Sequence, residues 1–246
     1  MTEPIVSVCM ITYNHENFIA QAIEGVVMQE TDFPIELVIG EDCSTDKTRA
    51  MCEQYAALHP DVVRLLPSGA NLGMNRNFVR TVEACKAKYI AFLEGDDFWT
   101  YDRKLQEQVE FLEAHPQYSG CGYSIKIGNA DGVVISDNHQ EPCRTRDVSL
   151  QDICRHVYVP CLTLMFRKDK LPLNWREKIM ANPVGDIPLL VMLGQEGDLR
   201  FFKKPAGVYR SGAGVWGASK QLDKIATTQQ LVNHIGVCFK SDHADV

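Results

Sequence analysis

Basic side chains are scarce in this sequence: 25 Lys and Arg stand against 32 Asp and Glu, which gives a formal net charge of −7. A general nucleic-acid-binding protein needs a basic stripe, so we expect no nucleic-acid partner. The nine cysteines include no CxxC pair, and neither they nor the seven histidines show metal-ligand spacing. A signal peptide is also lacking, so we expect a cytoplasmic location.

Long apolar runs are absent too, so any association with the inner face of the membrane is expected to be peripheral. The composition is otherwise that of a globular protein, with 45% hydrophobic and 23% charged residues over 246 positions. This length can bury a substantial core. With no internal repeat or linker, the sequence predicts a single composite domain over residues 1–246.

Apolar runs alternate with stretches of helical periodicity through the first part of the chain. We expect strands over 5–12, 35–39, 62–66 and 89–93, and helices over 18–27, 47–58 and 75–86. Strands that alternate with helices of this length predict βαβ units and an α/β fold with a mostly parallel sheet.

The later part of the chain is less regular. We expect a helix around 105–112, strands over 118–127, 133–135, 163–166, 199–202 and 207–209, a polar loop over 136–147, an apolar helix around 189–193 and a terminal helix over 222–235. This part is therefore predicted to be mixed rather than purely parallel.

Three carboxylates follow the buried strand that ends near Leu93: Glu94, Asp96 and Asp97. Such a cluster repels itself unless a cation lies among the oxygens or water solvates them. In an open α/β sheet the carboxyl end of a central strand is where ligands bind, so we expect a divalent metal that carries a diphosphate. The alternative is that one of these acids caps the helix beginning near Asp102.

Four motifs occur along the chain, and their order and spacing together are more informative than any one of them. They are Thr12-Tyr13-Asn14, Glu41-Asp42-Cys43-Ser44-Thr45-Asp46, Asn71-Leu72-Gly73 and Glu94-Gly95-Asp96-Asp97-Phe98-Trp99. This set resembles the family 2 glycosyltransferases of the GT-A type, and especially bacterial lipopolysaccharide and capsule enzymes with an EGDD[YF]W run. The resemblance implies a Rossmann-like central sheet flanked by helices. It also implies a nucleotide-sugar-binding half over 1–115, an acceptor half over 116–217 and a C-terminal helix and tail over 218–246.

The resemblance also implies roles for individual residues. The residues it implies for nucleotide binding are Thr12, Tyr13, Asn14, Glu16, Asp42, Asn71, Glu94, Asp96 and Arg210. Asp96 would coordinate the metal, Mn²⁺ or Mg²⁺, and the acceptor side would include Asp97, Trp99 and Trp216. Two alternatives stay open on the residues themselves. Asp42 would pair with a uracil or thymine N–H or else organise its own loop, and Trp216 would stack on an acceptor sugar or lie in the core.

The sequence departs from the family pattern in two loops. Phe78 stands where the commoner pattern has an arginine, with Arg76 as the nearest substitute. The stretch from Tyr209 to Trp216 resembles a loop that closes over the diphosphate, and Arg210 offers it a fork of donors. That stretch lacks the histidine of the family loop.

The reaction implied is an inverting displacement, in which a carboxylate removes the acceptor's proton. Asp186, in Gly185-Asp186-Ile187-Pro188, is our candidate for this base. The alternative is that Asp186 is an ordinary N-cap of the helix that follows. Weaker rivals for the base are Asp169, Glu177, Glu196 and Asp198.

The sequence thus predicts a glycosyltransferase that moves a sugar from a UDP-, dTDP- or GDP-linked donor to a glycan or lipid-linked saccharide of the bacterial surface. Two alternatives remain. One is a sugar-phosphate nucleotidyltransferase, which would prefer a Gly-rich basic loop after its first strand. The other is a protein that binds nucleotide sugars without catalysis, which the missing arginine and histidine would favour.

Overall fold

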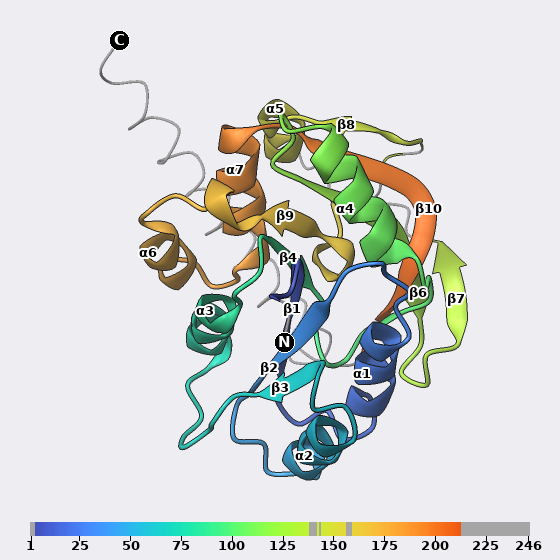
Figure 1. Ribbon diagram of the computed structural model, residues 1–246, viewed down its shortest axis with the longest axis vertical. Coiled ribbons are helices and arrows are strands. Elements are labelled where there is room, and N and C mark those ends of the chain that lie inside the picture. The colour runs from blue at the N-terminus through green and yellow to red at the C-terminus, as the bar shows by residue number, and fades with distance from the viewer. Residues whose placement is uncertain (1–2, 138–141, 143, 156–158, 213–246) are drawn as a thin grey trace.

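A computed structural model describes residues 3–137, 142, 144–155 and 159–212 (Figure 1). The strands are β1 (Val6–Thr12), β2 (Ile35–Glu41), β3 (Val63–Leu65), β4 (Tyr89–Phe92), β5 (Phe98–Trp99), β6 (Gly120–Gly128), β7 (Val134–Asp137), β8 (Arg146–Val148), β9 (Met165–Arg167) and β10 (Leu199–Arg210). The helices are α1 (Ile19–Val27), α2 (Thr48–Leu58), α3 (Met74–Ala84), α4 (Lys104–Ala114), α5 (Leu150–Cys154), α6 (Trp175–Met180) and α7 (Asp186–Glu196), with short 3₁₀ turns at Cys161–Thr163 and Lys168–Lys170.

One mixed sheet organises these elements in the order β3-β2-β1-β4-β9-β6-β10-β5. The first four strands pair in parallel. From β9 onward antiparallel pairs enter, although β6 and β10 run parallel along their whole length. The expected parallel first half and mixed second half are therefore confirmed.

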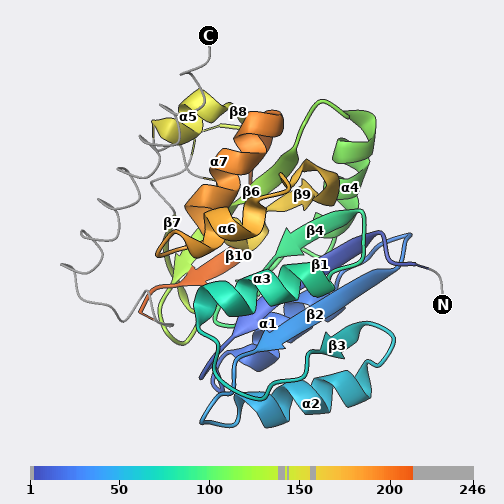
Figure 2. The same cartoon turned by 90° about the vertical axis from the view of Figure 1, so that its left-hand side faces the viewer.

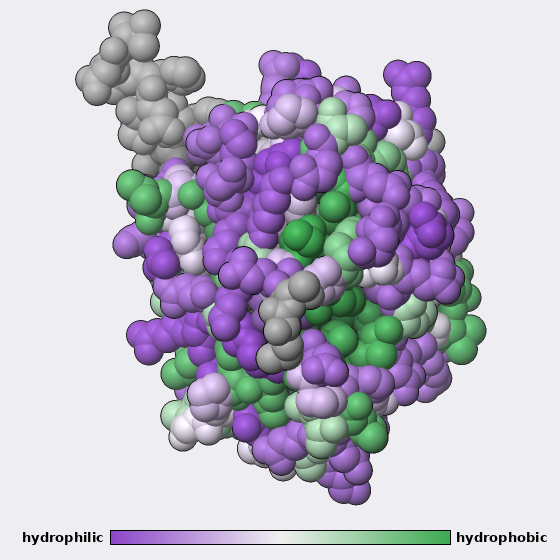
Figure 3. All heavy atoms as spheres, viewed as in Figure 1, coloured by the Kyte–Doolittle hydropathy of each residue, from purple (hydrophilic) through white to green (hydrophobic). Residues whose placement is uncertain are grey.

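Helices cover both faces of the sheet, because its central strands are apolar on both sides (Figure 2). Along β1, Val8 and Met10 pack into the core under α1, α2 and α4, while Cys9 between them packs into the core under α3, α6 and α7. This alternation follows from the two-residue period of a strand. The outer surface in Figure 3 is mostly polar, with apolar side chains gathered between α1 and α4.

Several expected boundaries need correction. The polar loop expected over 136–147 is wrong at both ends, because β7 runs to Asp137 and β8 begins at Arg146. The two late strands are a single strand, β10, with irregular pairing to β6 on either side of Pro205. Proline has no backbone N–H to donate, so a break in the ladder there is expected. The terminal helix expected over 222–235 lies outside the described residues.

No helix in the described part of the chain combines the length and apolar character of a membrane span. What the sheet does provide is a common edge. Since β1, β2 and β4 run parallel, their carboxyl ends meet there, and the next residues along the chain are Tyr13, Asp42 and Leu93. This edge is where an open α/β sheet places its ligands.

One lysine is buried beside the Trp99 ring. Lys104, at the start of α4, is fully buried, and its ammonium lies 3.8 Å from the centroid of the Trp99 ring. It donates a 2.8 Å hydrogen bond to Gln108 Oε1. Burial lowers the pKa of Lys104 from its ordinary 10.5 to about 7.

We expect Lys104→Met to stabilise the fold near neutral pH. Between about pH 7 and 10.5 the unfolded chain holds a proton that folded Lys104 has lost, so wild-type stability rises with pH across this window. The variant lacks this dependence. Its gain in free energy of unfolding should be on the order of 1–3 kcal/mol below pH 7 and should shrink as the pH rises. Urea unfolding at several pH values measures this, with exposed Lys86→Met as the control. An equal gain at all pH values would contradict the assignment.

Candidate active site

Three loops and one acidic turn meet at the carboxyl edge of the sheet. The loops follow β1 (residues 13–17), β2 (42–47) and β3 (66–73), and the turn is residues 94–97 after β4. Main-chain bonds tie the second loop and the acidic turn to the end of β1, since Asp42 N donates to Thr12 O and Gly95 N donates to Ile11 O. The sequence motifs therefore converge in space.

Side chains of the first loop bind the second loop. Asn14, in a left-handed conformation with φ 55°, accepts a 2.8 Å bond from Thr45 N. Glu16 Oε2 accepts from Lys47 N at 3.0 Å, and in return Glu16 N donates to Asp46 Oδ2. Asn14 and Glu16, both predicted to bind nucleotide, thus have structural partners here.

Asp42 fastens the third loop. Its two carboxylate oxygens accept bonds from Leu72 N at 2.8 Å and Gly73 N at 2.9 Å, and its side chain is buried. Asn71 Nδ2 donates back to the carbonyl of Asp42 at 2.8 Å. The structure shows the loop-organising role of Asp42. Its contact with a nucleotide base stays a prediction.

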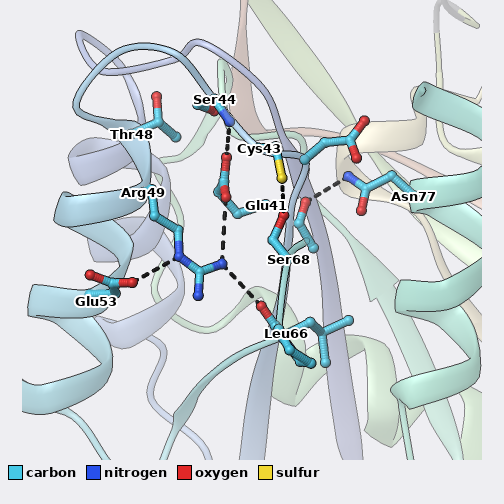
Figure 4. Close-up of polar contacts among 12 residues, drawn as sticks. Glu41, Cys43, Ser44, Thr48, Arg49, Glu53, Leu66, Ser68 and Asn77 are labelled. Carbon is cyan, nitrogen blue, oxygen red and sulfur yellow. Dashed lines mark hydrogen bonds and ion pairs between the residues drawn. The ribbon is translucent and has the colours of Figure 1, made fainter. Parts of the chain in front are cut away.

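Beneath these loops lies a buried carboxylate on β2 (Figure 4). Glu41 is fully buried and accepts a 2.6 Å bond from Ser44 N. Arg49 reaches it from α2 at 3.5 Å and also bonds Glu53 and the carbonyl of Leu66. One arginine thus links the end of β2 to the start of the third loop.

The acidic turn is electrostatically strained. Burial, and then the neighbouring Asp96 carboxylate, raise the pKa of Glu94 to about 7. Burial, Asp96 and Glu94 together raise the pKa of Asp97 well above its usual range. Glu94 Oε2 is buried with no hydrogen-bond partner, while Asp96 is part-exposed. Such an unsatisfied buried acceptor is costly and needs an explanation.

Gly95 allows this turn to lie against the first loop. A Cβ at position 95 would come within 2.5 Å of Thr12 Oγ1 and 3.1 Å of His15 Nδ1. Contacts under about 3 Å do not occur for a real Cβ, so a side chain here would displace the turn. Glycine at this position is therefore required by close approach.

Arg210, at the end of β10, supports the turn from below. Its backbone N donates to Asp97 Oδ1 at 2.8 Å and its guanidinium donates to the Asp96 carbonyl at 2.5 Å and to Gln21. The side chain is 2% exposed and lies between the rings of Phe18 and Phe98. The predicted contact of Arg210 with a diphosphate would have to come from this buried position.

Asp186, from the other half of the chain, lies near enough to the turn for its charge to act on Glu94. It is the first residue of α7, with Gly185 as the N-cap, and its Oδ1 accepts a bond from Ile187 N at 2.8 Å. Its charge contributes to the raised pKa of Glu94. The fold thus brings the predicted base to the acidic turn, although 92 positions separate residues 94 and 186.

The predicted acceptor-side residues have different surroundings. Trp99 is 2% exposed and donates its indole N–H to the Leu162 carbonyl at 2.6 Å, so here it is a core residue. Asp97 is buried, and its Oδ1 accepts the hydrogen bond from Arg210 N. Trp216 lies outside the described residues. Arg76 is exposed on α3, and Phe78 packs against the ring of Phe92 at 5.0 Å.

Comparison with known proteins decides the family. The model of glycosyl transferase family 2 matches residues 7–171, more than half of the chain. This chain belongs to glycosyltransferase family 2. An uncharacterised protein of Mycobacterium tuberculosis is 31% identical over 215 residues, which cover 85% of this chain and 60% of the relative. TuaG of Bacillus subtilis, provisionally named a teichuronic acid biosynthesis glycosyltransferase, is 30% identical over 68% of this chain and 64% of its own. This chain thus spans less than two thirds of the length of these relatives.

Solved structures share the fold of this family 2 member. Residues 1–349 of S. aureus TarS in complex with UDP-GlcNAc superpose with a TM-score of 0.65 at 19% identity, covering 87% of this chain and 61% of that TarS chain. The mannosyltransferase PcManGT of Pyrobaculum calidifontis, in complex with GDP-Man and Mn²⁺, gives 0.62 at 16% identity, covering 88% and 60%. The expected GT-A architecture is therefore confirmed.

The side chains at this edge suit a metal that a substrate helps to hold. No three His, Cys, Asp or Glu side chains in the described ranges converge on one ion. A Mg²⁺-type ion, however, is commonly held by one or two carboxylates together with substrate phosphates. Part-exposed Asp96 beside the unpartnered Glu94 Oε2 fits that arrangement.

His15 is the residue that sequence reasoning missed. Its Nδ1 lies 3.1 Å from Thr12 Oγ1, and its Nε2 lies 3.9 Å from Asp96 Oδ2. Burial lowers its pKa, although Asp96 and Asp46 act in the other direction. Sequence spacing could not reveal it, because its partner is 81 positions away.

We expect Asp42→Asn to loosen the third loop of this family 2 member. An asparagine offers one acceptor where two N–H groups point, so the free energy of unfolding should fall by about 1–3 kcal/mol. Hydrogen exchange at the Leu72 and Gly73 amides should accelerate, while exposed Asp61→Asn should change neither quantity. Unaltered exchange at both amides would contradict this role.

Proposed function

We propose that the chain is an inverting glycosyltransferase that takes a sugar from a nucleotide-diphosphate donor, with Asp186 as general base. One observation carries this proposal: Asp186 at the start of α7 and the Glu94–Asp97 turn after β4 are close enough for their charges to interact, at the ligand-binding edge of a GT-A fold. A direct displacement needs a charge-neutralising site and a base on opposite sides of the reacting carbon. The two groups come from the two halves of the chain.

The donor nucleotide is assigned to the first half, over residues 1–115. The side chains of this half proposed to meet it are Thr12, Tyr13, Asn14, Glu16, Asp42, Asn71, Glu94 and Asp96, and Arg210 is proposed to join them from the second half. Their mutual bonds hold the loops in position before any ligand arrives, which lowers the ordering cost of binding. The neighbours that bind UDP-GlcNAc and GDP-Man support a nucleotide sugar, with UDP, dTDP or GDP as the carrier.

Asp96 is the residue proposed to hold a Mn²⁺ or Mg²⁺ ion. A divalent ion there supplies a Lewis acid for the departing diphosphate. Glu94 is proposed to contact the ribose or the metal's surroundings. Arg210 donates hydrogen bonds to the backbone carbonyl of Asp96 and to the side-chain Oδ1 of Asp97, so it holds the turn and the Asp97 carboxylate in place.

On the acceptor side, within 116–217, Asp186 takes the proton of the attacking hydroxyl. Its bond to Ile187 N fixes its carboxylate at the helix start, so its orientation needs no adjustment when an acceptor enters. Asp97, Trp99 and Trp216 are proposed for this side. Trp99 would act through its packing, because its ring is buried.

The acceptor is proposed to be a glycan or a lipid-linked saccharide of the bacterial surface. The name of TuaG, which refers to teichuronic acid, supports this class. Synthesis of such polymers from cytoplasmic nucleotide sugars would place the protein in the cytoplasm, in peripheral contact with the inner face of the membrane.

We expect Asp96→Asn to abolish metal-dependent nucleotide binding. The neutral amide keeps the shape of the side chain but removes the charge that attracts the ion. Calorimetric titration of UDP, dTDP and GDP, each with and without Mn²⁺, measures this, and Asp61→Asn is the matched control. Metal-dependent binding of wild-type strength in Asp96→Asn would contradict the assignment.

Asp186→Asn should leave nucleotide binding within about twofold of wild type and reduce turnover on the order of 10²–10⁴-fold, because only the proton acceptor is lost. Hydrolysis of a panel of UDP-, dTDP- and GDP-sugars, in which water replaces the acceptor, gives the rate. Near-normal turnover in this variant would remove Asp186 from the reaction. Nucleotide binding without any turnover in the wild type would favour a binding protein instead.

A further inference from the structure

The imidazole of His15 occupies a fixed place between the first loop and the acidic turn. Its side chain is 11% exposed, so it is not a solvated surface group. The backbone is held as well, since His15 N donates a 2.8 Å bond to Thr48 Oγ1. On the ring, Nδ1 meets Thr12 Oγ1 at 3.1 Å. The second nitrogen, Nε2, is directed to the Asp96 carboxylate.

The separation of His15 Nε2 from Asp96 Oδ2 is informative. At 3.9 Å the two atoms are too far apart for a hydrogen bond, which needs about 2.7–3.2 Å. Two ligands about 2.1 Å from one octahedral ion lie about 3.0 Å apart when adjacent and about 4.2 Å apart when opposite. The observed gap lies between these two values, so a small side-chain movement would let one ion meet both atoms. The two atoms make no direct hydrogen bond that an ion would have to break.

Two further observations point to the same place. Glu94 Oε2, on the same turn, is a buried acceptor without a partner. Gly95 is the residue that lets the His15–Thr12 pair approach, since a Cβ there would collide with Thr12 and press tightly on the His15 ring. The local chain is thus built to bring this imidazole against the carboxylates.

We propose that His15 Nε2 and Asp96 Oδ2 together ligate the divalent cation, so that the protein supplies an imidazole as well as a carboxylate. Thr12 is then a positioning residue. When Nδ1–H donates to Thr12 Oγ1, the ring is in the tautomer whose Nε2 lone pair faces Asp96. This inference rests on the proposed function, because the ion it concerns is the one that accompanies the donor diphosphate.

A consequence for metal choice follows. Carboxylate and water oxygens alone suit Mg²⁺ and Mn²⁺ alike, whereas an imidazole favours a transition metal over Mg²⁺. Wild-type protein should therefore prefer Mn²⁺ to Mg²⁺ more strongly than a variant without the imidazole. The preference is measurable by binding and needs no knowledge of the acceptor.

The test compares wild type with His15→Gln, using Mn²⁺ together with UDP, dTDP or GDP as the probe. Pulsed electron paramagnetic resonance of bound Mn²⁺ should show coupling to an imidazole nitrogen in the wild type and none in His15→Gln. Titration should show Mn²⁺ binding at least about tenfold weaker in the variant, with a smaller Mn²⁺ to Mg²⁺ preference. His59→Gln is the control. His59 is half-buried, and its ring stacks on Tyr55 at the C-terminal end of α2, so this variant should behave as wild type.

A second variant covers the case in which His15→Gln folds poorly. Thr12→Val keeps the side-chain shape and removes the hydroxyl, and it should weaken Mn²⁺ binding about 10–100-fold while the imidazole coupling persists. If Mn²⁺ and nucleotide bind to the wild type without any nitrogen coupling, His15 is not a ligand and the proposed function stands. If no nucleotide binds with the metal, the proposed function fails, and this inference fails with it.

Discussion

Repulsion among the carboxylates after β4 is the constraint around which this molecule is arranged. Left in water, such acids would separate, yet here Glu94 and Asp97 are held in a buried turn and their pKa values rise as a result. The strands on either side prevent the turn from relaxing. Upstream, β4 pairs with β1, and downstream, β5 pairs with β10, whose last residue holds the turn by its backbone and side chain.

Hydrogen bonds between side chains and backbone fix the neighbouring loops. The sequence predicts that Asn14, Glu16 and Asp42 bind a ligand. In the structure each of them accepts a hydrogen bond from the next loop along the edge. These bonds give the loops one shared conformation. A residue that organises a loop and a residue that meets a ligand need not be different, because a carboxylate oxygen can accept more than one hydrogen bond.

Much of this could be read from the sequence. Buried strands and amphipathic helices of the first half follow directly from periodicity, and the acids after Leu93 mark the edge where ligands bind. The second half was harder, because Pro205 interrupts the pairing of β10 without ending the strand, and the short helices α5 and α6 carry little periodic signal. Contacts between residues far apart in the sequence could not be predicted from it. Neither the approach of His15 to Asp96 nor the burial of Arg210 beneath the turn has a local pattern that could have revealed it.

Gly95 sets the tolerance of this region to sequence drift. Its missing side chain is the space in which Thr12 and His15 sit, so three residues from two distant motifs form one steric unit. A methyl group gained at position 95 would require Thr12 to move, whereas the His15 ring would have to give by only a few tenths of an ångström. The side chain that excludes a larger residue at position 95 is therefore that of Thr12, whose place at the end of β1 is fixed by the pairing of the sheet.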